Sequence, residues 1–163
     1  MIAGVDTGVN GGLVVLDKDG NVIEMHTIPK NGKDTDYNAL AEIFTTFAER
    51  NFMVGLEEVH AIFGSAAKAT FSFGYIYGFL NALCIANKIR YVQIPPKKWQ
   101  KYIWTNGDIV LKLNKRVDTK ATSLNAAGRL FPNQSFRATK RSTTPSDGLV
   151  DAALIAYYVL KNY

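Results

Sequence analysis

Apolar residues fall in short runs near the start of the chain, with the spacing of β-strands. Residues 2–6 and 13–16 form two such runs on either side of a glycine-rich stretch, and this pattern predicts a β-hairpin. A predicted turn at 17–20 leads to a third strand at 21–28, which is followed by a polar loop at 29–36. We therefore expect the chain to open with three antiparallel strands.

Helices and strands alternate in the middle of the chain. Apolar residues recur every three or four positions in 37–50, which predicts a helix, and the apolar run at 53–59 predicts a strand. The longest helical pattern covers 66–87, and a further strand at 89–94 ends before two prolines. The remaining helices are predicted at 99–104, 119–130 and 145–160, the last of them capped by Ser146 or Thr144.

This order of elements predicts an α/β fold of three layers. Three hairpin strands followed by strand–helix alternation favour a five-stranded mixed sheet, first antiparallel and then parallel, with helices on both faces. A chain of 163 residues, 47% of them hydrophobic, can bury one substantial core. We expect residues 1–163 to form a single domain.

Cysteine content and hydropathy exclude several classes of protein. The single cysteine, Cys84, lies in an apolar helical segment, so neither a disulfide framework nor a cysteine-based zinc site is available. We expect it to be a small buried side chain. No signal peptide and no uninterrupted apolar run of about 18 residues is present, and we expect a soluble, cytoplasmic protein with no membrane partner.

Basic residues are concentrated in one part of the chain. Residues 97–141 contain eleven Lys or Arg against two Asp, whereas the remainder contains eight basic and twelve acidic residues. This contrast favours a polyanionic ligand such as nucleic acid, although a solvated surface is the alternative. The candidate DNA-binding residues are Lys97, Lys98, Lys101, Lys112, Lys115, Arg116, Arg137, Lys140 and Arg141.

Asp6 closes the first predicted strand, where a buried carboxylate needs a partner. That partner could be a cationic side chain, backbone N–H groups or a metal ion. Either Glu57 or Glu58 ends a later strand, and Asp147 and Asp151 share one face of the last helix. The helix N-terminus accounts for Asp147 without a metal, but less well for Asp151. Oxygen ligands without a Cys or His cluster favour Mg²⁺ or Mn²⁺, and two such ions could cleave a phosphodiester.

Three other residues near these acids have two possible roles each. Lys120 could stabilise charge on a scissile phosphate or be an ordinary surface lysine. We expect Trp99 to anchor its basic segment to the core rather than to stack on a base. His60 follows the glutamates and could contact the site or the substrate, but an ordinary strand-end histidine is the simpler interpretation.

Gly74 and Gly78 lie four residues apart in the predicted helix at 66–87 and leave one of its faces nearly flat. Close packing within the chain is the simpler explanation, and a self-associating dimer face is the alternative.

Six short motifs occur in order along the chain. They are Gly4-Val5-Asp6-Thr7-Gly8, Leu56-Glu57-Glu58-Val59-His60-Ala61, Phe73-Gly74 through Gly78, Pro96 to Trp99 with Lys101, Lys120-Ala121-Thr122-Ser123 leading to Leu130-Phe131-Pro132, and Asp147-Gly148-Leu149-Val150-Asp151-Ala152. Together they resemble the RuvC-type Holliday-junction resolvases of the ribonuclease-H-like superfamily, and more closely the bacteriophage members. Each motif alone is a weak signal, but the ordered set is specific.

The resemblance implies a ribonuclease-H-like domain that acts as a homodimeric, magnesium-dependent endonuclease. Such enzymes resolve four-way DNA junctions by paired nicks, and phage members also cut other branched DNA, in the host cytoplasm. The resemblance implies that the metal ligands are Asp6, Glu57 rather than Glu58, Asp147 and Asp151, and that Lys120 joins them as a catalytic residue. Two Mg²⁺ ions are expected, for which Mn²⁺ could substitute.

Other functions fit parts of the sequence. Actin-like ATPases have a similar Asp-x-Gly hairpin, but they need two such domains, which 163 residues do not accommodate. A non-catalytic protein that binds branched DNA and a ribonuclease that acts on RNA–DNA hybrids stay as alternatives.

Overall fold

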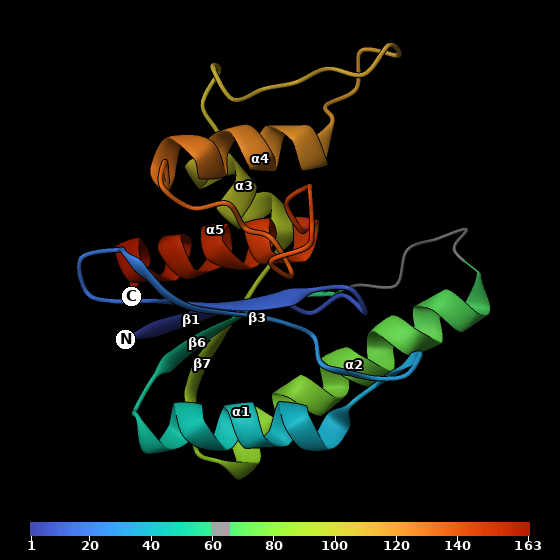
Figure 1. Cartoon of the computed structure of the whole chain (residues 1–163), viewed down its shortest axis with the longest axis vertical. Coiled ribbons are helices and arrows are strands. Elements are labelled where there is room, and N and C mark those ends of the chain that lie inside the picture. The colour runs from blue at the N-terminus through green and yellow to red at the C-terminus, as the bar shows by residue number, and fades with distance from the viewer. Residues whose placement is uncertain (60–65) are drawn as a thin grey trace.

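The computed structural model describes residues 1–59 and 66–163, and its centre is a five-stranded mixed sheet (Figure 1). The strands are ordered β3-β2-β1-β6-β7 across the sheet. Their bounds are Ile2–Asp6 for β1, Gly12–Leu16 for β2, Val22–Thr27 for β3, Met53–Glu57 for β6 and Arg90–Ile94 for β7. The first three strands pair antiparallel, and β1, β6 and β7 pair parallel, as the sequence predicted.

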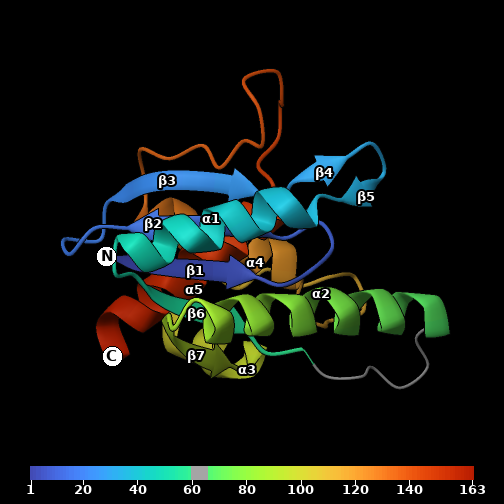
Figure 2. The same ribbon diagram turned by 90° about the horizontal axis from the view of Figure 1, so that it is seen from below.

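Helices cover both faces of the sheet, which confirms the three predicted layers (Figures 1 and 2). On one face lie α1 (Tyr37–Glu49) and α2 (Ala67–Ala86). On the other face α5 (Asp147–Asn162) lies directly on the strands, and α3 (Pro96–Ile103) and α4 (Thr119–Leu130) pack against it. Side chains of β2 alternate between the two cores, so every residue of this strand is buried.

Several element boundaries differ from the predictions. The predicted loop at 29–36 contains a small hairpin of two short strands, β4 (Lys30–Asn31) and β5 (Asp34–Thr35). The helix α3 begins at Pro96 rather than at 99, because proline fits the first turn of a helix, where no N–H is needed. The helix α5 begins at Asp147, directly after Ser146, and β6 ends at Glu57.

Glycines allow α5 to lie unusually close to the sheet. A Cβ atom added to Gly148 would lie 2.5 Å from the backbone oxygen of Asn10, and one added to Gly4 would collide with the backbone of Ala152. A side chain at either position would therefore push the helix outward. These contacts place the first turns of α5 next to the end of β1.

The helix α2 is apolar but packs through only one side. Its buried side chains are Ile76, Leu80 and Cys84, the last as predicted. Added Cβ atoms at Gly74 and Gly78 would meet nothing within 4 Å in the described structure, so the expectation that these glycines pack closely within the chain is wrong. By length and composition alone, this helix could also span a membrane.

Candidate active site

The parallel pairing of β1 and β6 brings two acidic residues to the same edge of the sheet. Asp6 and Glu57 are the last residues of these neighbouring strands. The buried hydroxyl of Thr7 donates a hydrogen bond to the backbone oxygen of Glu57 at 3.0 Å, which joins the two strand ends. An isolated bridge between Gly11 and Gly148 brings the start of α5 to this edge as well.

Asp6 is half-buried and has one of the partners predicted for it. The backbone N–H of Gly8 donates to its Oδ1 at 2.9 Å. Burial raises the pKa of Asp6, the hydrogen bond from Gly8 opposes this rise, and the negative charge of Asp147 adds to it. The folded protein therefore holds this carboxylate at a cost that one backbone N–H does not remove.

Glu57 is held in place by an indole. The Nε1–H of Trp99 donates to its Oε1 at 3.0 Å. The pKa of Glu57 is raised to about 8, mainly by burial and also by the charges of Asp6 and Asp151, while the hydrogen bond from Trp99 opposes the rise. Trp99 is fully buried, as predicted, and it also positions Glu57, which was not foreseen. This role of Trp99 could have been inferred from the sequence, because a buried indole N–H usually needs a hydrogen-bond acceptor.

Asp151 has an unsatisfied oxygen. Its Oδ1 is buried and has no hydrogen-bond partner in the described structure. Burial raises the pKa of Asp151 to about 7, with smaller contributions from the charges of Asp6 and Asp147, whereas a hydrogen bond from Ser123 and the charge of Lys120 lower it. A buried carboxylate oxygen without a donor is where a cation would be most favourable.

Asp147 and Lys120 form an ion pair at the mouth of this cluster. The Nζ of Lys120 lies 2.6 Å from Oδ2 of Asp147, and the two side chains are 73% and 55% exposed. The hydrogen bond and the charge of Asp147 raise the pKa of Lys120, which keeps it protonated. An exposed pair of this kind contributes little to stability, so Lys120 can exchange partners easily.

Of the two adjacent glutamates, Glu57 is the last residue of β6 and Glu58 follows it. The backbone N–H of Glu58 donates to the oxygen of Ile94 at 2.9 Å, which continues the pairing of β6 and β7. The charges of Asp6 and Asp151 raise the pKa of Glu57, which places Glu57 beside these two aspartates. His60 lies outside the described residues.

The donor set fits a hard divalent cation. All four side chains supply carboxylate oxygens, and burial and mutual repulsion raise the pKa values of three of them. They share one edge without converging on one point: among residues 1–59 and 66–163, no group of three or more His, Cys, Asp or Glu side chains is already arranged to hold a metal. Binding a cation would thus require side-chain movement, beginning with the exposed pair of Asp147 and Lys120.

The nine basic candidates for DNA binding are all exposed, and they lie on three segments. Three are on α3, three follow it in the connection to α4, and three are in the connection from α4 to α5. In the described part of the chain, none of them forms an ion pair with an acidic side chain. Lys98 contacts Tyr158 and Tyr163 near the end of α5, at the opposite end of that helix from Asp147.

Comparisons with known proteins give structural matches only. No family model matches the sequence, and no curated protein matches it. RuvC of Thermus thermophilus in complex with a Holliday junction substrate has a TM-score of 0.63 at 12% identity, over 96% of this chain and 90% of that one. A second structure of T. thermophilus RuvC has a TM-score of 0.56 at 16% identity, over 96% and 91% of the two chains.

The third match is Ydc2, the yeast mitochondrial Holliday junction resolvase. Its TM-score is 0.53 at 19% identity, over 98% of this chain and 77% of that one. All three matches span nearly the whole of this chain and include the sheet that carries the acidic residues. The chain therefore has the ribonuclease-H-like fold of the RuvC-type Holliday-junction resolvases.

Proposed function

We propose that this protein is a metal-dependent endonuclease that resolves Holliday junctions and other branched DNA by paired nicks. One observation carries the proposal: four acids from three separate segments, Asp6, Glu57, Asp147 and Asp151, gather at one edge of a fold that junction resolvases share. A structural protein would gain nothing from burying carboxylates whose pKa values rise toward neutrality.

These four residues would hold Mg²⁺, with two ions expected and Mn²⁺ as a substitute. When bound, the metal would supply an activated water and positive charge beside the phosphodiester. The residues around the acids keep them in position. Trp99 donates to Glu57 and Ser123 donates to Asp151, while Oδ1 of Asp151 stays without a partner in the described structure.

Lys120 would act on the substrate directly. Its ammonium group is exposed and pairs with Asp147, which a metal would engage. Released from this pair, the lysine would neutralise a non-bridging oxygen of the scissile phosphate. The nine exposed basic residues would bind phosphates of the DNA duplexes that meet at the junction, because their positive charges lie on three exposed segments.

Paired nicks need two sites, and we propose that a second copy packs on α2. At 100° per residue, the exposed face of this helix lies opposite its buried face. The exposed face contains Phe71, Gly74, Tyr75, Gly78 and Ile85. Phe71 is 72% exposed, Tyr75 is 54% exposed and Ile85 is 65% exposed. Glycines with open space above them let a second helix approach closely.

The proposal is tested by cleavage of four-way, three-way, flap, duplex and RNA–DNA hybrid substrates with and without Mg²⁺. Wild type should cut the four-way junction, and Asp6→Asn should cut it at least about a hundredfold more slowly while binding it as tightly or more tightly. Asp19→Asn, in an exposed turn, is the matched control and should cut normally.

Three outcomes would contradict the proposal. Equal cleavage by Asp6→Asn and wild type would exclude the acidic site. Binding of branched DNA without cleavage of any substrate would favour a non-catalytic binder, and cleavage of hybrids alone would favour a ribonuclease.

A further inference from the structure

The connection between α3 and α4 forms a projecting hairpin, residues 109–117, which we call the arm. Figure 1 shows this connection extending beyond α4, away from the sheet. The N–H of Lys112 donates to the oxygen of Arg116 at 2.8 Å, and the N–H of Lys115 donates to the oxygen of Lys112 at 2.9 Å. Lys115 has a φ of +62°, the left-handed residue that three-residue hairpin turns require. The arm is thus a formed turn with a defined tip.

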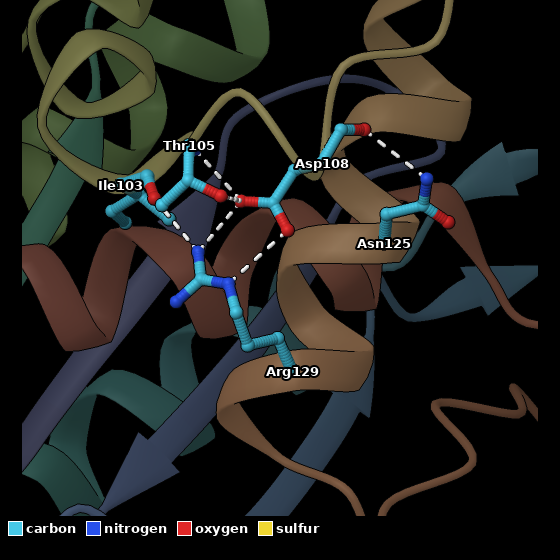
Figure 3. Close-up of polar contacts among 5 residues, drawn as sticks. All are labelled: Ile103, Thr105, Asp108, Asn125 and Arg129. Atoms are coloured by element: carbon cyan, nitrogen blue, oxygen red, sulfur yellow. Dashed lines mark hydrogen bonds and ion pairs between the residues drawn. The ribbon is translucent and has the colours of Figure 1, made fainter.

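One end of the arm is fixed by an ion pair between the buried Asp108 and the partly exposed Arg129 (Figure 3). Asp108 accepts hydrogen bonds from Nε and Nη2 of Arg129, at 3.1 and 2.7 Å, and its side chain is only 5% exposed. It also accepts from the N–H and the hydroxyl of Thr105, both at 2.8 Å. Asn125 donates to the backbone oxygen of Asp108 at 3.1 Å. This two-pronged, charge-assisted contact holds the start of the arm against α4.

The other end of the arm joins α4 next to the acidic site. Asp118 caps α4, and its N–H donates to the oxygen of Val110 at 2.7 Å, which closes the hairpin. The N–H of Val110 donates to the hydroxyl of Thr122 at 3.1 Å. In the same turns of α4, Lys120 pairs with Asp147 and Ser123 bonds to Asp151. The arm therefore stands on the helical turns that reach the carboxylates.

The tip of the arm combines a bare apolar side chain with positive charge. Leu113 is fully exposed, and Lys112, Lys115 and Arg116 surround it in the sequence. The arm contains no acidic residue, and its other large apolar side chains, Ile109, Leu111 and Val117, are exposed as well. Single exposed apolar residues are common, but a hydrogen-bonded hairpin that presents one at its tip among cations suits a partner with both negative charge and apolar surface.

We propose that the arm is a wedge that recognises the branch point of DNA. Lys112, Lys115 and Arg116 bind backbone phosphates, and Leu113 packs against base faces where pairing is interrupted. Bases at a branch point are easier to unstack than those in a continuous duplex, so the wedge favours branched DNA over duplex. This inference rests on the proposed function and assigns to the arm the selection of branched substrates.

An anionic membrane surface has related chemistry, but the position of the arm favours DNA. The root of the arm is bonded to the turns of α4 that contact Asp147 and Asp151. A polyanion gripped by the arm would thus continue toward the residues proposed to cut it. A membrane bound by the arm would instead lie across the approach to the acidic site.

The test measures binding and base unstacking with 2-aminopurine placed at the branch point of a four-way junction, in EDTA. Wild type should increase the 2-aminopurine fluorescence. Leu113→Ser should lose this increase and bind the junction about fivefold or more weakly, with duplex affinity nearly unchanged. Leu113→Phe, which keeps a large apolar side chain at the tip, should keep both the fluorescence increase and the wild-type affinity for the junction. Ile23→Ser, also partly exposed but on β3, is the matched control and should behave as wild type.

A second variant tests the charges. Replacing Lys112, Lys115 and Arg116 by Ala should weaken binding to junction and duplex alike. It should also reduce the slope of log affinity against log salt concentration by about two to three, one phosphate contact for each residue. An unchanged slope would exclude the phosphate contacts.

The outcomes separate this inference from the proposed function. If wild type cuts junctions and Leu113→Ser gives the same fluorescence and affinity, the wedge is overturned while the nuclease stands. If wild type binds no branched DNA, both are overturned. If the protein binds phosphatidylserine vesicles but not DNA, and Leu113→Ser abolishes the vesicle binding, the arm is a membrane contact and the wedge is overturned.

Discussion

Asp151 combines burial, an unsatisfied oxygen and two acidic neighbours, a combination that destabilises the metal-free protein. Its pKa of about 7 in the folded protein lies well above that of an unfolded aspartate. The unfolded chain therefore releases this proton first as the pH rises, and the folded state is penalised at pH 8. A buried carboxylate that carries such a penalty is typical of a functional site.

Asp151→Asn should stabilise the metal-free protein. Removing the buried charge is expected to raise the free energy of unfolding at pH 8 by about 4 kcal/mol, the value that linkage gives for a pKa difference of about three units. Urea unfolding in EDTA measures it. A variant less stable than wild type at pH 8 would contradict the argument, as would a gain equally large at about pH 2, where both states hold the proton.

The pKa of Asp108 is shifted in the opposite direction to that of Asp151. Hydrogen bonds from Arg129, and further ones from Thr105, lower its pKa to about 2 against the effect of burial. A depressed folded pKa contributes stability that is present above the unfolded value near 4 and is lost as the pH falls toward 2.

Asp108→Asn should therefore cost about 2 kcal/mol of unfolding free energy at pH 7 and almost nothing near pH 2. Denaturant unfolding at the two pH values checks this difference. Asp118→Asn is a poor control because Asp118 caps α4, whereas Asp19→Asn lies in an exposed turn and should be neutral. A loss that does not depend on pH would mean that the ion pair with Arg129 is not its source.

At the scale of elements, the contact between α5 and the strands decides whether the acids meet. Gly4 and Gly148 leave no room for a side chain between helix and sheet. The same contact sets how near Asp147 and Asp151 come to Asp6. Helix packing and the geometry of the site are consequently linked through backbone rather than through side chains.

Gly148→Ala should damage both stability and cleavage. Its Cβ would lie 2.5 Å from the oxygen of Asn10, and overpacking of this kind typically costs about 1–3 kcal/mol. Because α5 would move away from β1, we expect cleavage to fall about tenfold or more. The matched control is Gly128→Ala in α4, where an added Cβ meets nothing within 4 Å.

Gly128→Ala should stabilise the protein by about 0.5–1 kcal/mol, since alanine loses less entropy in a helix. Thermal unfolding and junction cleavage of both variants are the measurements. Normal cleavage by Gly148→Ala would show that the distance between α5 and β1 is not critical.

At the scale of the whole molecule, the exposed face of α2 is the largest departure from an ordinary surface. A helix that is apolar on all sides usually has partners on two sides. Inside the described chain, α2 packs through the buried Ile76, Leu80 and Cys84 and the partly buried Phe79 and Leu83. The proposed dimer would cover the other side and supply the second active site.

Phe71→Ser combined with Ile85→Ser should convert a dimer to a monomer. Both side chains are mainly exposed and lie on the face opposite the buried one, so the fold itself should be preserved. Sedimentation at micromolar concentration measures the oligomeric state, and nicking of a junction on a supercoiled plasmid shows whether the two cuts stay paired. A monomeric wild type would contradict the dimer directly.

The order of the five strands of the main sheet and of the helices could be read from the sequence, because it depends on local patterns, and the acids stay a prediction. Apolar runs and helical spacing depend on neighbouring residues, and a carboxylate at a strand end, such as Asp6, stands out against its apolar surroundings. Boundaries were less accurate, as at Pro96 and Asp147, where capping geometry decides the first residue.

What the sequence determined by itself was therefore the succession of the main strands and helices and the burial of Cys84 and Trp99. Only the tertiary structure decided that Trp99 donates to Glu57, that Lys120 pairs with Asp147, that the glycines of α2 face outward, and that residues 109–117 form an arm fixed by Asp108 and Arg129. The physical reason is that these contacts join residues far apart in the chain, and their formation depends on how closely the layers pack rather than on any local pattern.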